Sequence, residues 1–298
     1  MSLRAELLRL CIRAFLKRRS HHLDLEAWRA NMRAMERLVP RPPARSETVL
    51  VDTGRLTLHR VATEKSAPER NVLYLHGGGY ISGGPAHYRH FSWRIADALN
   101  ARIWMLEYRL APEYPFPAAL QDAAEAYHWL AEQARDGPRP FVMGDSAGGG
   151  LALGLLLKLR DENAPLPAGA VALSPWTDLA LTGPSLTGNA AADPMLNADD
   201  LPQVARSYLA GEDPRTPYAS PLYGDTEGLP PVLIQVGSDE ILRDDAVRMA
   251  EKLRAHNPQS RLEVWLRMPH AWQLFVPVLP EARQAIARIG QFASELTW

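Results

Sequence analysis

Short apolar runs alternate with longer amphipathic stretches through most of the chain. Alternating patterns at 47–53 and 55–62, joined at Gly54, predict a β-hairpin. Compact apolar runs predict buried strands at 71–76, 101–108, 140–144, 168–174, 231–237 and 261–267. Patterns of helical period lie between them, at 87–99, 117–135, 147–161, 241–256 and 278–295. This order predicts an α/β protein, with a mostly parallel sheet of eight strands and helices on both faces.

Two segments depart from this alternation. Residues 1–40 predict two helices, and the prolines of RPPAR at 41–45 end the second one. In the first helix, apolar side chains form one face, with Leu3, Leu7, Cys11 and Phe15 four residues apart and Leu8, Ile12 and Leu16 beside them. Arginines and a lysine make the other surface basic. We expect that helix to dock on its own protein, with contact to a membrane surface as the alternative. Residues 178–228, rich in Gly, Pro, Asp and Asn, read as an insertion with one helical patch near 198–210.

Composition narrows the class of protein. The 298 residues are 46 % hydrophobic, which is enough for a large core, and the formal net charge of −1 gives no reason to expect a nucleic-acid partner. No run of about 18 apolar residues occurs, so no transmembrane segment is expected. The one cysteine, Cys11, cannot form an internal disulfide, which favours a reducing, cytoplasmic location.

The stretch GDSAG at 144–148 has the form G-x-S-x-G between a predicted strand and a predicted helix. A strand-to-helix turn this sharp leaves no room for side chains at Gly144 and Gly148, and it lifts the Ser146 hydroxyl above the carboxyl ends of the strands. The motif alone is also compatible with a structural turn or a phosphate-binding loop. Its position favours a nucleophilic serine.

A second glycine-rich loop, HGGG at 76–79, follows the third predicted strand. An acyl-transfer enzyme needs N–H donors for the oxyanion of its tetrahedral intermediate, and this is where that loop belongs in such an architecture. The expected donors are the N–H groups of Gly78, Gly79 and Ala147. We expect His76 to hold the loop rather than to act as a base.

A serine nucleophile needs a base, and a carboxylate to orient that base. Among nine histidines, His270 stands out because it follows the 261–267 strand on a loop at the carboxyl edge of the sheet. Asp239 follows the 231–237 strand, and Glu240, Asp244 and Asp245 are its rivals. Strand-end position favours Asp239, because Glu240 would begin the next helix and the other two lie further into it.

In order along the chain, the motifs HGGGY, YRLAPEYPFPAALQDA, GDSAGG, SPLYGD and GSDEIL resemble the hormone-sensitive-lipase-like family of microbial carboxylesterases. The resemblance covers about residues 70–275. It implies an α/β-hydrolase fold and hydrolysis of short- to medium-chain carboxylic esters, without a cofactor or metal. It also implies a helical cap made by residues 1–40 and about 180–215, over a catalytic domain of residues 41–298, and it allows a homodimer. Trp272, beside the catalytic histidine, is expected to shape the pocket wall.

Three other functions are compatible with the same fold and motifs. The first is a small-molecule-binding relative that has lost catalysis, against which the presence of His270 counts. The second is an amidase or peptidase, which differs only in the leaving group. The third is a lipase that works at a membrane through its basic N-terminal helix.

Overall fold

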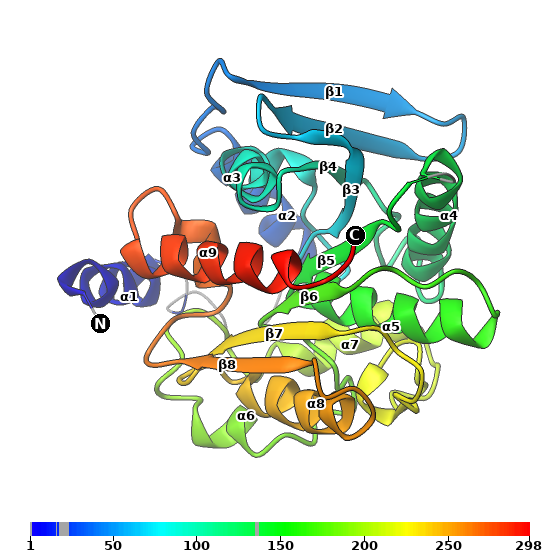
Figure 1. Cartoon of the computed structure of the whole chain (residues 1–298). Coiled ribbons are helices and arrows are strands. Elements are labelled where there is room, and N and C mark those ends of the chain that lie inside the picture. Colours follow the sequence, from blue (N-terminus) through cyan, green and yellow to red (C-terminus); the bar gives the residue numbers. More distant parts are fainter. Residues whose placement is uncertain (1, 16, 18–23, 135–136) are drawn as a thin grey trace.

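The computed structural model describes residues 2–15, 17, 24–134 and 137–298. An eight-stranded sheet of order β1-β2-β4-β3-β5-β6-β7-β8 runs through the molecule (Figure 1). The pairs β1–β2 and β2–β4 are antiparallel, and all other neighbours are parallel. The strands are β1 (Ser46–Asp52), β2 (Thr57–Thr63), β3 (Ala67–Leu75), β4 (Ala101–Leu106), β5 (Phe141–Asp145), β6 (Ala170–Leu173), β7 (Val232–Gly237) and β8 (Arg261–Trp265).

The helices lie at the positions that the apolar periodicity predicts, within a few residues. They are α1 (Leu3–Phe15), α2 (Leu25–Glu36), α3 (Arg89–Leu99), α4 (Ala118–Gln133), α5 (Ala147–Asp161), α7 (Leu201–Leu209), α8 (Arg243–His256) and α9 (Pro280–Ser294). The one-turn helix α6 (Ser185–Gly188) was not predicted, since four residues are too short for a periodic signal. Of the segment predicted to be helical over residues 1–40, residues 1, 16 and 18–23 lie outside the described part.

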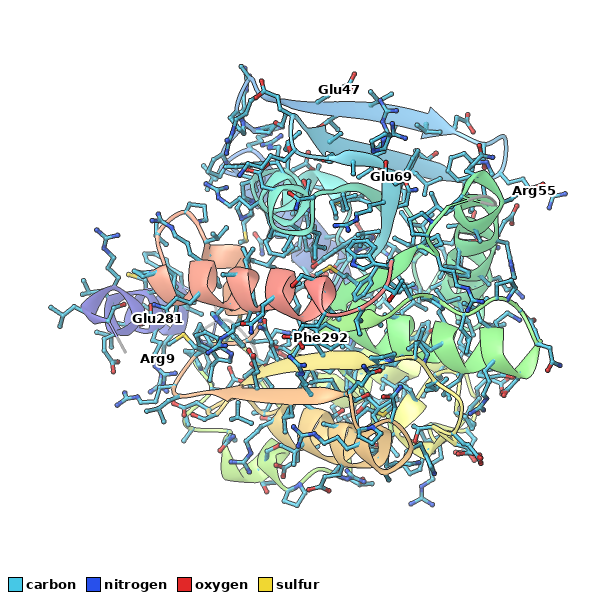
Figure 2. The ribbon with its side chains drawn as sticks, viewed as in Figure 1. Arg9, Glu47, Arg55, Glu69, Glu281 and Phe292 are labelled. Carbon is cyan, nitrogen blue, oxygen red and sulfur yellow. The ribbon has the colours of Figure 1, made fainter. Side chains whose placement is uncertain are left out.

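Helix α1 docks with only part of the predicted apolar face. Its buried residues are Ala5, Arg9 and Ile12, whereas Leu3 and Leu7 are 84 % and 63 % exposed. The helix begins beside α9, where the Ser2 backbone N–H and hydroxyl donate to the Glu281 carboxylate at 2.6 and 3.0 Å. Figure 2 shows Arg9 and Glu281 at the same end of the molecule. The expectation that α1 covers its own protein is confirmed. Of the predicted face, Ile12 is buried but Leu3 and Leu7 are not, because polar contacts decide the docking.

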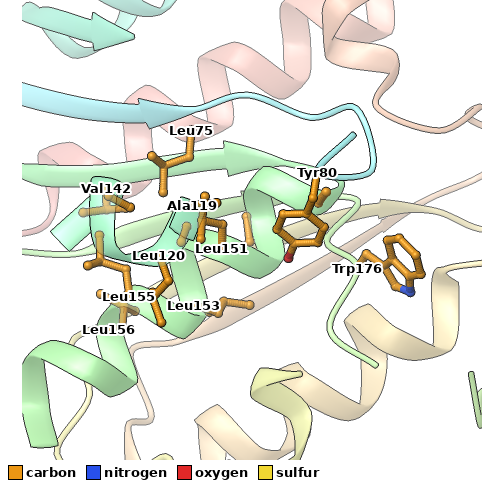
Figure 3. Packing of buried hydrophobic residues seen from close by; sticks show 14 of the residues in the cluster. Leu75, Tyr80, Ala119, Leu120, Val142, Leu151, Leu153, Leu155, Leu156 and Trp176 are labelled. Atoms are coloured by element: carbon orange, nitrogen blue, oxygen red, sulfur yellow. The ribbon is translucent and has the colours of Figure 1, made fainter. Parts of the chain in front are cut away.

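The core has two parts, one on each face of the sheet. On one face, alternate strand residues such as Leu75 and Val142 pack with α4, α5 and α8, where Leu151 and Leu155 of α5 meet them (Figure 3). On the other face, the remaining strand residues pack with α3 and α9. Because β3 and β5 to β8 are parallel, the loops after them emerge at one edge of the sheet. That edge carries every predicted site residue.

No helix within the described ranges is both long and apolar enough to cross a membrane.

Candidate active site

Ser146 occupies the sharp turn between β5 and α5. Its backbone has φ 55° and ψ −123°, a left-handed region that a residue with a side chain adopts only under strain. The turn closes tightly: a Cβ on Gly144 would lie 2.2 Å from the Gly148 carbonyl oxygen, and one on Gly148 would lie 2.1 Å from that of Leu75. The two glycines are therefore required by close backbone approach, as the motif predicts.

The strained turn is fixed from both sides by backbone hydrogen bonds. The Ser146 N–H donates to the Leu173 carbonyl at 2.8 Å, and the Ser146 carbonyl accepts from the Trp176 and Gly150 N–H groups at 3.0 Å each. Strain of this kind costs about 1–3 kcal/mol, and it persists only where the surroundings hold the backbone in place. The Ser146 side chain is half-buried, so its hydroxyl is held at the loop edge of the sheet but stays accessible.

His270 lies on the loop after β8 and is paired with a carboxylate. Its Nδ1 is 2.8 Å from Oε2 of Glu240, and the two residues are 3 % and 0 % exposed. The second oxygen of Glu240, Oε1, accepts from the Ser174 hydroxyl at 2.8 Å and from the Gly237 N–H. The Ser174 hydroxyl also accepts from the Ala271 N–H at 3.1 Å. Glu240 is thus held on one side while its other oxygen orients the imidazole.

The sequence prediction placed Asp239 in this position, and the structure does not bring Asp239 to the histidine. The Asp239 carboxylate binds the Arg9 guanidinium at 2.8 Å and accepts from the Ser238 hydroxyl at 2.8 Å. Glu240 does not begin a helix either, because α8 starts only at Arg243. In the short turn after β7, the two adjacent side chains point to different partners, so strand-end position does not choose between them.

Opposing effects act on the pKa of His270. Burial lowers the pKa, but the hydrogen bond and charge of Glu240, supported by the charges of Asp193 and Asp145, raise it above its ordinary value of 6.5. The imidazolium that forms when the histidine accepts a proton is therefore stabilised by its surroundings. This is the environment that a general base next to a serine needs.

The loop after β3 presents free N–H groups. Gly78 and Gly79 have φ values of 124° and 67°, and the Gly78 carbonyl accepts from the Ile81 and Ser82 N–H groups, which turns the chain. Within the described part of the chain, neither the Gly78 nor the Gly79 N–H donates to another protein group. Ala147 is the first residue of α5, where an N–H has no acceptor within the helix. The three predicted oxyanion donors are thus uncommitted.

Asp145 is a residue that sequence reasoning missed. Its buried carboxylate accepts from the hydroxyls of Tyr74 and Tyr88 at 2.9 Å each and from the Gly77 N–H at 3.0 Å. Burial raises its pKa from 3.8 to about 6, against the effect of these donors. The contact joins the residue before Ser146 to the HGGG loop. The only sign of Asp145 in the sequence was an acidic residue at the end of an otherwise apolar strand.

His76 holds the loop, as expected, and is not placed as a base. Its ring stacks on Tyr108 with centroids 4.1 Å apart, and its Nδ1 lies 2.9 Å from the Gly77 carbonyl. Burial lowers its pKa to about 4, which keeps the ring neutral. The Tyr108 hydroxyl donates to the His76 carbonyl at 2.7 Å, so Tyr108 braces this loop.

Helix α7, from the predicted insertion, reaches the HGGG loop. A Cβ on Gly79 would lie 2.8 Å from a methyl carbon of Val204, and Tyr208 stacks on Tyr80 with ring centroids 3.8 Å apart. Trp272, in contrast, does not line a pocket. It is fully buried in the cluster with α9 and packs beside Trp265. Its large apolar ring is better accommodated in the core than at the site.

A cavity of about 430 Å³ lies next to the HGGG loop. Its lining includes Ser82, Gly83 and His87, together with Arg29 of α2, whose Nε donates to the Ile81 carbonyl at 2.8 Å. Across the described ranges, no cluster of three or more His, Cys, Asp or Glu side chains is arranged to hold a metal ion. The candidate site consists of Ser146, the His270–Glu240 pair and the N–H groups of the HGGG loop and Ala147.

Comparison with known proteins finds one family model and relatives that are named as esterases or acetyl-hydrolases. A family model described as alpha/beta hydrolase fold matches residues 72–274. An acetyl-hydrolase from Streptomyces hygroscopicus is 49 % identical over 229 residues, which cover 76 % of each chain. An esterase from Acinetobacter venetianus is 35 % identical over 226 residues, covering 76 % of this chain and 75 % of that one.

Solved structures agree over nearly the full length. An esterase from the bacterial hormone-sensitive lipase family superposes with a TM-score of 0.92 at 40 % identity, covering 99 % of this chain and 98 % of that one. A hormone-sensitive lipase from a metagenome library gives a TM-score of 0.92 at 36 % identity, with the same coverage. With its serine turn, HGGG loop and eight-stranded sheet, this chain belongs to the α/β-hydrolase family, in the hormone-sensitive-lipase-like group of esterases.

Proposed function

We propose that this protein is a serine carboxylesterase that hydrolyses short- to medium-chain carboxylic esters through an acyl-enzyme intermediate. The observation that carries the proposal is the buried His270–Glu240 pair at the same sheet edge as the strained Ser146 turn. A relative without catalysis has no need for a buried carboxylate on its histidine, because such a group is costly to desolvate.

In the proposed acylation step, Nε2 of His270 takes the hydroxyl proton of Ser146 while Oγ attacks the ester carbonyl carbon. The carbonyl oxygen becomes an oxyanion and accepts from the N–H groups of Gly78, Gly79 and Ala147. The C–O bond to the alcohol then breaks, and His270 returns the proton to the departing alcohol oxygen. A water molecule repeats the sequence on the acyl-enzyme and releases the carboxylic acid.

We assign the orienting role in this triad to Glu240. Its Oε2 accepts the Nδ1–H of His270, which selects the tautomer with a free Nε2 and stabilises the imidazolium. The Ser174 hydroxyl and the Gly237 N–H hold Oε1, so the carboxylate cannot rotate away. The nucleophile and base remain those that the sequence predicted.

We also propose that residues 1–40 and about 180–215 act as a cap that limits the size of the acyl chain, over a catalytic domain of residues 41–298. The contact of α7 with Gly79 and Tyr80 supports this, because it puts the second segment against the proposed oxyanion loop. A series of p-nitrophenyl esters from acetate to palmitate tests it. We expect kcat/KM to peak at short or medium chains and to fall steeply for palmitate.

The direct test of the proposed function is Ser146→Ala. With p-nitrophenyl butyrate as substrate we expect the activity to fall at least about a thousandfold, since the nucleophile is removed. A serine-reactive phosphonate should add one adduct mass to the parent protein, located at Ser146, and none to the variant. Activity of the variant within tenfold of the parent would contradict the assignment.

We further propose that the protein forms a homodimer and resides in the cytoplasm. Strand β8 is an edge of the sheet. Val264 within it is 47 % exposed, and Leu266 directly after it is 70 % exposed. Edges of this kind tend to pair with another strand, so Leu266→Lys should convert a dimer to a monomer in light scattering. The one cysteine, Cys11, is free and exposed, as is typical of a reducing compartment, and fractionation of cells tests the location.

A further inference from the structure

Arg9 of α1, labelled in Figure 2, is a buried cation with three hydrogen-bond partners outside its own helix. It is 8 % exposed, and its guanidinium donates to the Arg267 carbonyl at 2.8 Å, to Oδ2 of Asp239 at 2.8 Å and to the Ala192 carbonyl at 3.3 Å. A buried charge is tolerated only when it is paired and hydrogen-bonded. Arg9 therefore joins three segments that are far apart in the sequence.

Two of these segments carry the proposed triad. Asp239 immediately precedes Glu240, and Arg267 lies three residues before His270. A second link lies beside the first: the Ser238 hydroxyl accepts from the Arg267 N–H at 2.8 Å and donates to Asp239 at 2.8 Å. The loop with the acid and the loop with the base are thus tied together by Arg9 at the point where they leave the sheet.

The third segment is tied to the same place. The Arg13 guanidinium donates to the Ala191 carbonyl at 2.6 Å, and the Lys17 ammonium donates to the Ala190 and Asp193 carbonyls. Arg9 and Arg13 of α1, together with Lys17 beyond the end of that helix, therefore hold residues 190–193. The Asp193 carboxylate in turn accepts from the N–H of Ile241, the residue after Glu240, at 2.9 Å.

We propose that Arg9 is a positioning residue for the triad, which keeps Asp239 turned away from His270 so that Glu240 alone is its partner. This rests on the proposed function and extends it. Asp239 and Glu240 are both carboxylates. Without the guanidinium, Asp239 would be a partly buried charge one residue from the acid, with the Ser238 hydroxyl as its remaining described donor, and it would compete with Glu240 for the imidazole. Arg9 selects between two chemically similar neighbours.

The test compares Arg9→Met and Arg9→Lys with Arg4→Met, a matched control on the exposed side of the same helix. The concentration of active sites in each enzyme is measured by titration with a serine-reactive phosphonate. The rate of p-nitrophenyl butyrate hydrolysis at 25 °C is then divided by that concentration to give kcat per labelled site. We expect Arg9→Met to lower kcat about 10- to 100-fold with KM within about threefold, as displacement of a catalytic group by about 1 Å does. Arg9→Lys should recover most of the loss, and Arg4→Met should match the parent.

A double variant separates positioning from simple stabilisation. Asp239→Asn added to Arg9→Met removes the unpaired carboxylate, and we expect kcat per labelled site to rise at least about fivefold over Arg9→Met alone. If Arg9→Met folds poorly, the double variant can still be tested, because it lacks both the Arg9 cation and the Asp239 anion and so leaves neither charge unpaired. A kcat per labelled site within threefold of the parent in Arg9→Met, or no gain in the double variant, overturns the proposal. If the parent itself neither labels nor hydrolyses esters, the proposed function has failed instead.

Discussion

Replacing Glu240 by Gln tests the corrected triad most directly. The exchange keeps the shape of the side chain but removes the charge that faces the imidazolium across a 2.8 Å contact. With the two charges spread over their groups, about 4 Å apart, and an effective dielectric constant of about 20, their attraction is about 4 kcal/mol. Because about 1.4 kcal/mol corresponds to a factor of ten, kcat should fall about a thousandfold.

Two further variants make this prediction specific. Glu240→Asp keeps the charge but shortens the side chain by one methylene, so it cannot reach His270 and still accept from Ser174; an intermediate loss of about 10- to 100-fold is expected. Asp239→Asn removes the carboxylate that pairs with Arg9 and leaves the His270–Glu240 pair intact, so kcat should stay within about tenfold of the parent.

The assay is hydrolysis of p-nitrophenyl butyrate at pH 8, with sites counted by phosphonate labelling of a highly purified sample. KM should change little, because Glu240 makes its interaction in the transition state. The reasoning would be refuted if Glu240→Gln retained more than a tenth of the parent kcat, or if Asp239→Asn lost as much activity as Glu240→Gln.

Three other predictions concern pH and packing. Because Glu240 raises the pKa of His270, the acid limb of kcat/KM should have its midpoint above pH 6.5, and a flat profile from pH 8 down to 5 would argue against this base. Tyr208→Leu removes the aromatic stack on Tyr80 and should lower kcat several-fold. Tyr208→Phe removes a hydroxyl that has no described partner, so this variant should retain the kcat and the thermal stability of the parent. Equal losses of kcat in the two variants would contradict this prediction. Burial raises the pKa of Asp245 from 3.8 to about 8. Ionisation of this carboxyl therefore opposes folding, and the stability of the protein should fall as pH rises between these two values. Asp245→Asn should flatten the dependence of Tm on pH over that range, and an unchanged slope in the variant would contradict the prediction.

Local patterns were enough to predict the sheet, the helices and most of the site. Ser146 and the HGGG loop are recognisable because a tight strand-to-helix turn and free amides each require glycines at fixed positions. His270 was found from its place after the last strand. These features depend on residues close together in the sequence, and the structure has them at the predicted positions.

The choice between Asp239 and Glu240 depends on residues that are distant in the sequence. Arg9, which binds Asp239, is 230 residues away from it, and Ser174, which holds Glu240, is 66 residues away. The docking face of α1 was only partly predicted for the same reason. Periodicity favoured Leu3 and Leu7, whereas carbonyl and carboxylate partners elsewhere in the chain bury Arg9 instead. The pattern of apolar residues along the sequence carries no information about contacts between polar residues that are far apart in it.

Helix α1 docks through contacts between residues that are very distant in the sequence. Ser2 binds Glu281 across 279 residues, and Arg9 binds the Arg267 carbonyl across 258. Contacts this distant form slowly during folding, because a long stretch of chain has to close before they are made. Helix α1 therefore docks only after the sheet and the loops that hold its partners have formed, and we expect ester hydrolysis to recover late during refolding from denaturant, together with the docking of α1.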